Sequence, residues 1–434
     1  MLLEFRTKNY KSFQDEVVFS MTKAPRQTGL DYSVQTVRIG KKSYSGLSSA
    51  VIYGPNASGK TNLISAMDTM RSIVLRGNIK NSDAVASPND AAYSLELIPN
   101  CNSDKAPTMF SISFIDKEKL FDYSFSVDLG GFMEKEYSRE IISEKLSVNG
   151  KVQFQRNHLE LDIPGTAMFF NSSVYKNINL TLSIAQNSIN KDELFLCNGF
   201  KTIFSKEIVS EILSWFEEKF IVIYRSDAVR VMRKFADPKE NTIYVNKTLN
   251  EAAKSFGITS NALGYKPEGD DVVLYSIFKD DKKIAAIPAE SFESYGTIRF
   301  INEFPLVIRS LMDGATLVMD EFDASIHPMA LMNIINIFHN DDINKKGAQL
   351  IFNTHNPIFL NASLFRRDEI KFVERNKETN GSVHYALSDF KTSDGIRKGE
   401  DYMTNYFVSR YGAIEDVDFT PLMEKIISSN GGEK

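Results

Sequence analysis

Hydrophobic and polar residues alternate along the first twenty positions of the chain, as they do in half-buried β-strands. The alternation predicts two short strands, over 2–6 and 16–20, with a polar turn between them. It returns between about 108 and 165, where turn residues such as Asn149 and Gly150 separate the apolar runs. We therefore expect an antiparallel sheet in the N-terminal part of the chain.

Three apolar runs show no alternation, which is typical of strands that are buried on both faces. They cover 50–53, 316–319 and 350–352. A helical pattern follows the first run from Thr61 onward. Buried strands combined with helices predict an α/β fold with a mixed central sheet, and such sheets bind ligands at the edge where the strands end.

The middle of the chain has a different pattern. Between about 175 and 260 the residues are mostly helix-like, and Ser205 is a candidate N-cap. A second alternating stretch, over 271–292, predicts a hairpin. We expect an N-terminal lobe with the antiparallel sheet, a mainly helical insertion with a hairpin, a C-terminal lobe, and a tail that packs on the core, over residues 1–170, 171–285, 286–390 and 391–434.

The composition is that of a soluble globular protein, with 434 residues, 42% hydrophobic and 25% charged. This length favours roughly two to three lobes. The formal net charge of −5 argues against a chain coated in nucleic acid, although a local basic patch is compatible with it.

Targeting and redox signals are also missing from the sequence. Cys101 and Cys197 provide neither a disulfide framework nor the ligand spacing of a zinc site. No run of about 18 apolar residues suggests a membrane span, and the chain opens on a strand pattern rather than a signal peptide. We expect a cytoplasmic protein without a membrane partner.

The segment after the first buried run has the spacing of a phosphate-binding loop, G-x-x-x-x-G-K-[ST]. Glycines let backbone N–H groups converge on phosphate oxygens, and the N-terminus of the following helix adds partial positive charge. Lys60 would contact the β- and γ-phosphates of ATP, and the Thr61 hydroxyl would bind Mg²⁺. The predicted nucleotide-binding residues here are Gly54, Pro55, Asn56, Ala57, Ser58, Gly59, Lys60, Thr61 and Asn62.

The second buried run ends in Asp320 and Glu321. A strand that ends this way delivers two carboxylates to the ligand-binding edge of the sheet. Asp320 would hold Mg²⁺, and Glu321 would orient and polarise the attacking water. The alternative is a strand end with two solvated acids, which we disfavour because a complete phosphate loop lies upstream.

Two further segments are candidates for contact with phosphate. His355 follows the third buried run, where an imidazole can sense the γ-phosphate, and a purely structural histidine is the alternative. Ser294 and Gly296 open a predicted helix, and a helix N-terminus can hold phosphate.

As an ordered set, these segments resemble the ABC-type ATPase heads of SMC, Rad50, RecF and overcoming-lysogenisation-defect proteins. More narrowly, the chain resembles the AAA15 group of bacterial ATPases, which includes RloA-like and abortive-infection AbiL-like proteins. The segments that carry the resemblance span the whole chain, at 8–13, 54–61, 293–297, 320–321, 326–328, 354–357, 387–391 and 410–414.

The resemblance implies a P-loop NTPase of the ABC-ATPase type with an active site shared between two subunits. Ser294 and Gly296 of one subunit would close over the ATP held by the other, and Ala324–Pro328 would line the interface between them. Lys11 and Ser12 would lie beside the nucleotide, whereas a solvated turn is the alternative for this pair.

The chain departs from the general pattern of ABC-type heads in two places. The closing segment reads Ser-Tyr-Gly-Thr from Ser294, where transporters have Ser-Gly-Gly-Gln. In addition, the glutamine that such heads use near Mg²⁺ and water is not placed, and Gln153, Gln155 and Gln186 are all open as candidates.

For function, the resemblance implies an ATP-dependent switch in which two heads close on ATP and hydrolysis releases them. Related heads serve bacterial anti-phage systems in which a nucleic acid or phage protein is the trigger and a separate effector, commonly a nuclease, is the output. The sequence contains no recognisable nuclease motif, so we expect the effector to be another chain.

Three alternatives remain open. They are a DNA-repair head that acts directly on DNA, a transport ATPase subunit, and a scaffold that binds ATP without hydrolysing it. The acidic balance and the missing coiled coil disfavour the first. About 230 residues separate Thr61 from Ser294, too many for a compact transporter subunit, and the intact acidic pair disfavours the scaffold.

Overall fold

The computed structural model describes most of the chain. The described residues are 1–25, 27–80, 95–103, 106–132, 134, 138–164, 167–171, 177–224, 242–255, 257, 261–268, 271–280, 283–324, 326–391, 399–415 and 418–430. Within them, no helix combines the length and the apolar composition needed to cross a bilayer.

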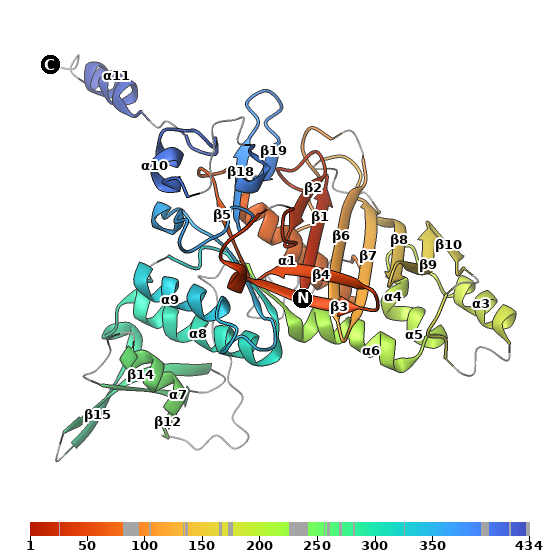
Figure 1. Ribbon diagram of the computed structural model, residues 1–434, viewed down its shortest axis with the longest axis horizontal. Coiled ribbons are helices and arrows are strands. Elements are labelled where there is room, and N and C mark those ends of the chain that lie inside the picture. Colours follow the sequence, from red (N-terminus) through yellow and green to blue (C-terminus); the bar gives the residue numbers. More distant parts are fainter. Residues whose placement is uncertain are drawn as a thin grey trace.

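A six-stranded sheet forms the centre of the molecule, in the order β11-β16-β17-β5-β18-β19 (Figure 1). The first five strands are parallel, and β19 pairs with β18 in the antiparallel direction. The three buried runs of the sequence form three adjacent strands, which confirms the mixed central sheet. The strands are β5 (Ser49–Tyr53), β11 (Phe220–Ile223), β16 (Thr316–Met319), β17 (Gln349–Asn353), β18 (Ile370–Arg375) and β19 (Ser382–Ala386).

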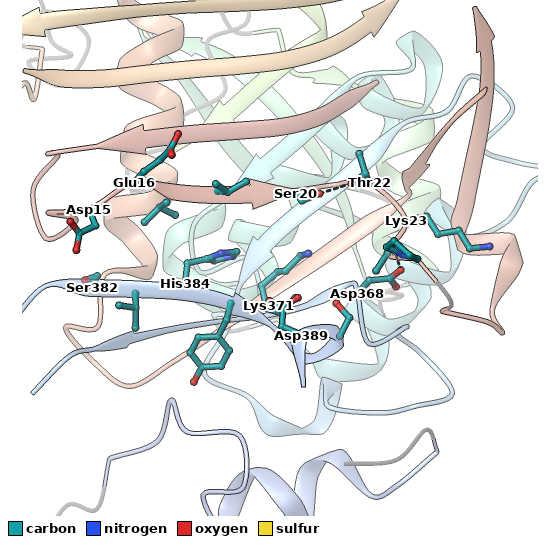
Figure 2. A pocket seen from close by; sticks show the side chains of 18 residues that line it. Asp15, Glu16, Ser20, Thr22, Lys23, Asp368, Lys371, Ser382, His384 and Asp389 are labelled. Carbon is teal, nitrogen blue, oxygen red and sulfur yellow. Dashed lines mark hydrogen bonds between the residues drawn. The ribbon is translucent and has the colours of Figure 1, made fainter. Parts of the chain in front are cut away.

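A seven-stranded antiparallel sheet lies beside the central sheet, in the order β10-β9-β8-β7-β6-β1-β2. It confirms the predicted N-terminal strands and meander, and Asn149 and Gly150 turn between β8 and β9 with φ of 52° and 76°. Its edge strand β2 lies next to β19, the edge of the central sheet (Figure 2). The strands are β1 (Leu2–Lys8), β2 (Val17–Ser20), β6 (Thr108–Asp116), β7 (Lys119–Asp128), β8 (Glu140–Val148), β9 (Lys151–Asn157) and β10 (Glu160–Asp162).

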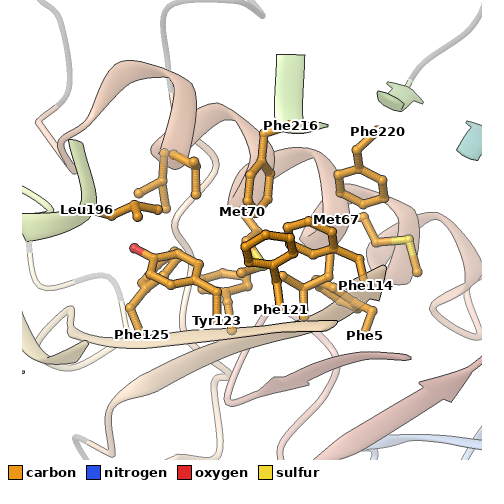
Figure 3. Packing of buried hydrophobic residues seen from close by; sticks show 14 of the residues in the cluster. Phe5, Met67, Met70, Phe114, Phe121, Tyr123, Phe125, Leu196, Phe216 and Phe220 are labelled. Atoms are coloured by element: carbon orange, nitrogen blue, oxygen red, sulfur yellow. The ribbon is translucent and has the colours of Figure 1, made fainter. Parts of the chain in front are cut away.

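The helix α1 (Lys60–Arg76) packs between the two sheets, with Met67 and Met70 against the aromatic face of the antiparallel sheet (Figure 3). Phe114 of that face stacks on Trp215, with ring centres 3.8 Å apart, and Trp215 stacks in turn on Phe220 of β11. All of these side chains are buried, and burial of each large apolar side chain contributes about 1.5–3 kcal/mol. The core therefore fixes the start of α1, and with it the end of the predicted phosphate loop that leads into this helix.

The opposite face of the central sheet is covered by α8 (Tyr295–Asp313) and α9 (Pro328–Phe338). Alternate residues of each central strand face the two cores. On β5, for example, Ile52 packs toward α1, whereas Val51 and Tyr53 pack toward α8 and α9. This two-sided burial explains why the strand sequences are continuously apolar.

The insertion contains the expected helices and hairpin but more strand than expected. Its helices are α3 (Ile178–Asn187), α4 (Phe195–Asn198), α5 (Phe200–Ile203), α6 (Lys206–Ser214) and α7 (Lys247–Ser255), with Trp215–Lys219 as a π-helical turn. Ser205 precedes α6 as its N-cap residue, without a capping hydrogen bond from its side chain. The strand β11 within this segment joins the central sheet, because its apolar residues complete the core beside β16.

A separate four-stranded sheet projects from α8, in the order β12-β13-β14-β15 (Figure 1). Its last two strands form the predicted hairpin. The strands are β12 (Tyr244–Val245), β13 (Ala262–Glu268), β14 (Asp271–Asp280) and β15 (Lys283–Pro288). A small ribbon that the sequence patterns did not predict consists of β3 (Val34–Ile39) and β4 (Lys42–Leu47).

The C-terminal tail divides into two parts. The helix α10 (Tyr402–Phe407) packs on the core through Tyr402 and Tyr406. In contrast, the described side chains of α11 (Thr420–Asn430) are all exposed. Short 3₁₀ turns complete the described structure, at Asp31–Ser33, Ala289–Ser291, Pro357–Phe359 and Leu387–Asp389.

Candidate nucleotide site

The loop between β5 and α1 closes tightly on its surroundings. A Cβ atom at Gly54 would lie 2.0 Å from the backbone oxygen of Val373, and one at Gly59 would lie 2.5 Å from the Ser382 hydroxyl. Gly59 also has a φ of 113°, which favours glycine. The glycines of the sequence pattern are thus required by the local packing of this loop.

Lys60 is buried and folds back over the loop. Its ammonium donates hydrogen bonds to the backbone oxygens of Gly54, at 2.8 Å, and Pro55, at 2.9 Å. Burial lowers the pKa of Lys60 to about 8, and Asp320 and Glu321 oppose this shift. The site therefore holds a cation whose charge is only weakly stabilised by the protein alone.

The acidic pair meets the loop at the carboxyl ends of the strands. The Thr61 hydroxyl donates to Oδ1 of Asp320 at 3.1 Å, and the side-chain amide of Asn353 donates to the same oxygen at 2.5 Å. Asp320 is buried, and burial raises its pKa. A hydroxyl and a carboxylate oxygen are hard ligands of the kind that Mg²⁺ prefers, so these residues fit the predicted metal role.

Glu321 is held through its backbone. Its φ of 50° is left-handed and is unusual for a non-glycine residue. Its N–H donates to Oδ1 of Asn353, and its backbone oxygen accepts a hydrogen bond of 2.5 Å from Arg299 of α8. Both peptide groups beside the predicted base are thus fixed by side chains from neighbouring elements, while its own side chain is exposed.

Arg299 belongs to a buried ion pair within α8. Its guanidinium lies 2.9 Å from Glu303, which is 1% exposed, and burial raises the pKa of Glu303 to about 7. Asn353 and Arg299 were not singled out in the sequence. The signal for Asn353 was present, because it ends the same strand that precedes His355, whereas nothing local to Arg299 indicates its contact.

His355 is exposed at the end of β17. Its pKa is lowered by partial burial and by the nearby Lys60, and Glu321 opposes the shift. The preceding Thr354 donates to Asp323 at 2.6 Å, which ties this segment to the turn after Glu321. The structure therefore brings His355 close to Lys60 and Glu321, and its role toward γ-phosphate stays a prediction.

Ser294 is the N-cap of α8, and its hydroxyl accepts a hydrogen bond from the Thr297 N–H at 3.2 Å. Ser294 is exposed and Gly296 is buried at the start of the helix. The exposed serine is available to a partner, but closure over another subunit's ATP stays a prediction. Of the predicted interface segment 324–328, residue 325 lies outside the described residues, and His327 caps α9.

Lys11 and Ser12 lie in the turn between β1 and β2, and they have different surroundings. The Ser12 hydroxyl accepts a hydrogen bond of 2.8 Å from Asn62, next to the phosphate loop. The Lys11 ammonium instead forms an ion pair with Glu96 and donates to Ser65 at 2.6 Å. A contact between Lys11 and nucleotide, which stays a prediction, would require its ammonium to turn away from Glu96.

The three candidate glutamines lie away from this site. Gln153 bonds to Lys151 and Met168, Gln155 to Asp162, and Gln186 to Leu159 and Leu161. These contacts lie at the β9–β10 end of the antiparallel sheet, whereas the turn that carries Ser12 joins β1 and β2 at the other end. The structure thus places none of the three beside Thr61 and Asp320, the predicted ligands of Mg²⁺.

Two comparisons with known proteins place these observations in context. Residues 49–361 match the model of a family described as AAA domain, putative AbiEii toxin, Type IV TA system. The match covers more than half of the chain and includes the phosphate loop, the acidic pair and His355. A comparison with curated proteins gave no match.

Proposed function

Because the chain belongs to this family of AAA domains with a putative toxin role, and so to the P-loop ATPases, we propose that it is an ATP-hydrolysing molecular switch. The observation that carries the proposal is the convergence of Thr61, Asp320, Asn353 and Glu321 at one edge of the central sheet. A site that only bound nucleotide would not need a carboxylate on a fixed backbone next to the predicted metal ligands.

In the proposed reaction, the phosphate loop and Lys60 hold the β- and γ-phosphates of ATP, and Thr61 and Asp320 provide the oxygen ligands for Mg²⁺. Bound Mg²⁺ would neutralise part of the phosphate charge. Glu321 accepts a hydrogen bond from the attacking water and orients it toward the γ-phosphate. ATP binding keeps Lys60 protonated, because phosphate charge replaces the solvation that burial removes.

The switch itself depends on a second subunit. Ser294 of one copy would contact the γ-phosphate held by another, so the closed pair would be stabilised only while that phosphate is present. The exposure of Ser294 and Tyr295 at the start of α8 supports this arrangement. Hydrolysis would remove the shared contact and open the pair.

We propose further that the switch serves bacterial anti-phage defence. The family description names a putative toxin of a type IV toxin–antitoxin system, which supports an abortive-infection role. The chain would act as the sensor and control a separate effector, such as a nuclease. A direct role in DNA repair is the second candidate, and DNA-stimulated hydrolysis that weakens with salt would favour it.

The substitution Glu321→Gln tests the proposal. It removes the base but keeps the size of the side chain, so ATP binding should persist while hydrolysis falls by at least about a hundredfold. Native mass in Mg-ATP should then show a trapped closed dimer or larger assembly. Lys60→Ala should instead lose ATP binding, and it is the matched negative control.

Two outcomes would contradict the proposal. Hydrolysis by the Glu321→Gln protein at the parental rate would remove Glu321 as the base. A Glu321→Gln monomer whose mass does not change with ATP would remove the shared site, and would leave an ATPase that works without a partner.

A further inference from the structure

A cavity of about 540 Å³ lies between β2 and β19, the facing edges of the two large sheets (Figure 2). Its volume is in the range of small-molecule sites. Its lining residues come from the β2 strand and turn, from β18 and from β19, and they include none of the residues Gly54–Asn62. The cavity is therefore separate from the nucleotide site.

One buried cation faces this cavity. Lys371 of β18 is 3% exposed, and its ammonium lies 5.9 Å from the ring centre of Phe19. Burial lowers the pKa of Lys371 to about 8, and the nearby Asp368, Asp389 and Glu369 oppose this shift, but among the described residues the ammonium forms no hydrogen bond or ion pair. A buried ammonium without a direct hydrogen bond is costly, so an acceptor inside the cavity would stabilise it.

A second unpartnered group lies next to it. The ring of His384 packs 5.5 Å from that of Phe19, and its Nε2 is buried without a hydrogen-bond partner among the described residues. Burial and the nearby Lys371 lower the pKa of His384 to about 3, so the ring is neutral at physiological pH. Its other ring nitrogen donates a hydrogen bond to the backbone of Val18 and so carries the proton of the neutral ring. Nε2 is therefore a hydrogen-bond acceptor.

The cavity is also lined by carboxylates. Asp15 and Asp389 line it and are exposed, and Asp389 also accepts a hydrogen bond of 2.8 Å from the Ala386 N–H. Asp368 lines it as well, but its carboxylate is already bound by Arg366, at 2.9 and 3.0 Å, and by the backbone N–H of residue 24. The cavity lining thus combines a buried cation that has no hydrogen-bond acceptor with exposed carboxylates.

We propose that this cavity binds a small molecule that carries both a carboxylate and an amino group. The carboxylate would accept hydrogen bonds from Lys371, and the amino group would donate to both Asp389 and Nε2 of His384. A simple anion would leave His384 without a donor and would be repelled by the lining carboxylates. A simple cation would leave Lys371 unpartnered.

The cavity is connected to the phosphate loop by one residue. Ser382, which lines it, donates its hydroxyl to the backbone oxygen of Ser58 at 2.5 Å and its N–H to that of Ser12 at 2.7 Å. A ligand that shifts β19 would therefore shift the loop. This coupling rests on the proposed ATPase function, whereas binding itself does not.

The test is calorimetric titration of the full chain, without nucleotide, with three probes of matched length: 4-aminobutanoate, butanoate and butylamine. The first should bind at least about tenfold more tightly than the other two, because only it provides both an acceptor for Lys371 and a donor for His384 and Asp389. Lys371→Met should abolish this preference. Lys23→Met is the matched control, since Lys23 lines the same cavity but is paired with Asp31 at 3.3 Å.

Asp389→Asn provides an independent check, because this residue is exposed and asparagine can still accept the hydrogen bond from Ala386. This variant should bind 4-aminobutanoate more weakly and leave the affinity for butanoate the same or higher. The proposal is overturned if 4-aminobutanoate does not bind the parent protein, if butanoate binds equally well, or if Lys371→Met binds as the parent does. None of these results depends on ATP hydrolysis, so the proposed function is tested separately.

Discussion

Arg299 shows how a single buried side chain can set the geometry of the proposed reaction. It connects α8, which carries the predicted closing residues, to the backbone of Glu321. A shift of α8 would therefore be transmitted to the base through one hydrogen bond. Errors of about 1 Å at a reacting group can cost a hundredfold in rate.

We predict that the double substitution Arg299→Met with Glu303→Met lowers kcat for ATP hydrolysis by about ten- to a hundredfold. The affinity for ATP should change by less than about twofold, because neither residue touches the loop. Both residues are replaced together, since an unpaired Glu303 would destabilise the fold. Steady-state kinetics and nucleotide titration measure the two quantities.

The matched control is Arg309→Met with Asp313→Met, an exposed ion pair of 3.6 Å on the same helix. It should leave both constants unchanged, because exposed pairs contribute little. If the buried double variant hydrolyses ATP at the parental rate, Arg299 does not position Glu321.

The protonation state of Lys60 should make ATP binding depend on pH. Its pKa of about 8 in the free protein lies below the usual 10.5, so the charged fraction falls steeply between pH 7 and pH 9. The Kd for ATP should rise about tenfold over this range, measured by titration with a non-hydrolysable analogue. Binding by Lys60→Arg should show no such dependence, because guanidinium stays charged.

Fold stability should change in the opposite direction. The unfolded chain holds a proton on Lys60 that the folded chain releases between pH 8 and 10.5, so this group makes folding more favourable as pH rises through that window. A fall in ATP affinity at high pH therefore cannot be attributed to unfolding caused by this residue.

Among the elements, the strand–loop–helix unit from β5 to α1 depends most directly on the sequence. Gly54→Ala would place a methyl group 2.0 Å from a backbone oxygen, which cannot move like a side chain. We predict a loss of about 1–3 kcal/mol in the free energy of unfolding and loss of ATP binding. Thermal unfolding with and without Mg-ATP measures both.

Gly40→Ala is the control for backbone conformation. Gly40 has a φ of 58°, and no atom lies within 4 Å of the position that a Cβ would occupy, so alanine should cost only about 1–2 kcal/mol and leave ATP binding intact. If both variants lose ATP binding equally, the clash with the Val373 backbone oxygen does not explain the need for glycine at position 54.

The sequence predicted those elements whose pattern is local. Local patterns predicted the phosphate loop, the acidic strand end, the meander and the 271–292 hairpin. The strand β11 could not, because its four residues are defined by pairing with β16, almost a hundred residues away in the chain. Arg299 belongs to the same class, since its contact with the backbone of Glu321 joins two distant elements and leaves no periodic signal, whereas the position of Asn353 at the end of an apolar run was visible in the sequence.

At the scale of the whole molecule, the two C-terminal helices make different contributions. Large apolar residues of α11 and its approach are exposed, among them Phe419 at 67% and Ile427 at 65%. We predict that truncation after residue 415 changes the free energy of unfolding by less than about 1 kcal/mol. Chemical denaturation followed by circular dichroism measures the change.

Truncation after residue 399 should behave differently. It also removes Tyr402, Tyr406 and Tyr411, which are buried in the core beside α8 and α9. Each large aromatic side chain contributes about 1.5–3 kcal/mol on burial, so the loss should be several kcal/mol. Equal stability of the two truncated proteins would show that α10 does not contribute to the core.

The stack of Trp215 between Phe114 and Phe220 joins the antiparallel sheet to the central sheet. Trp215 is also the single tryptophan of the chain. The protein therefore contains an intrinsic fluorophore at the joint between its two sheets. Light absorbed at the red edge of the aromatic band excites this one side chain, and its emission reports whether ATP moves the sheets relative to each other.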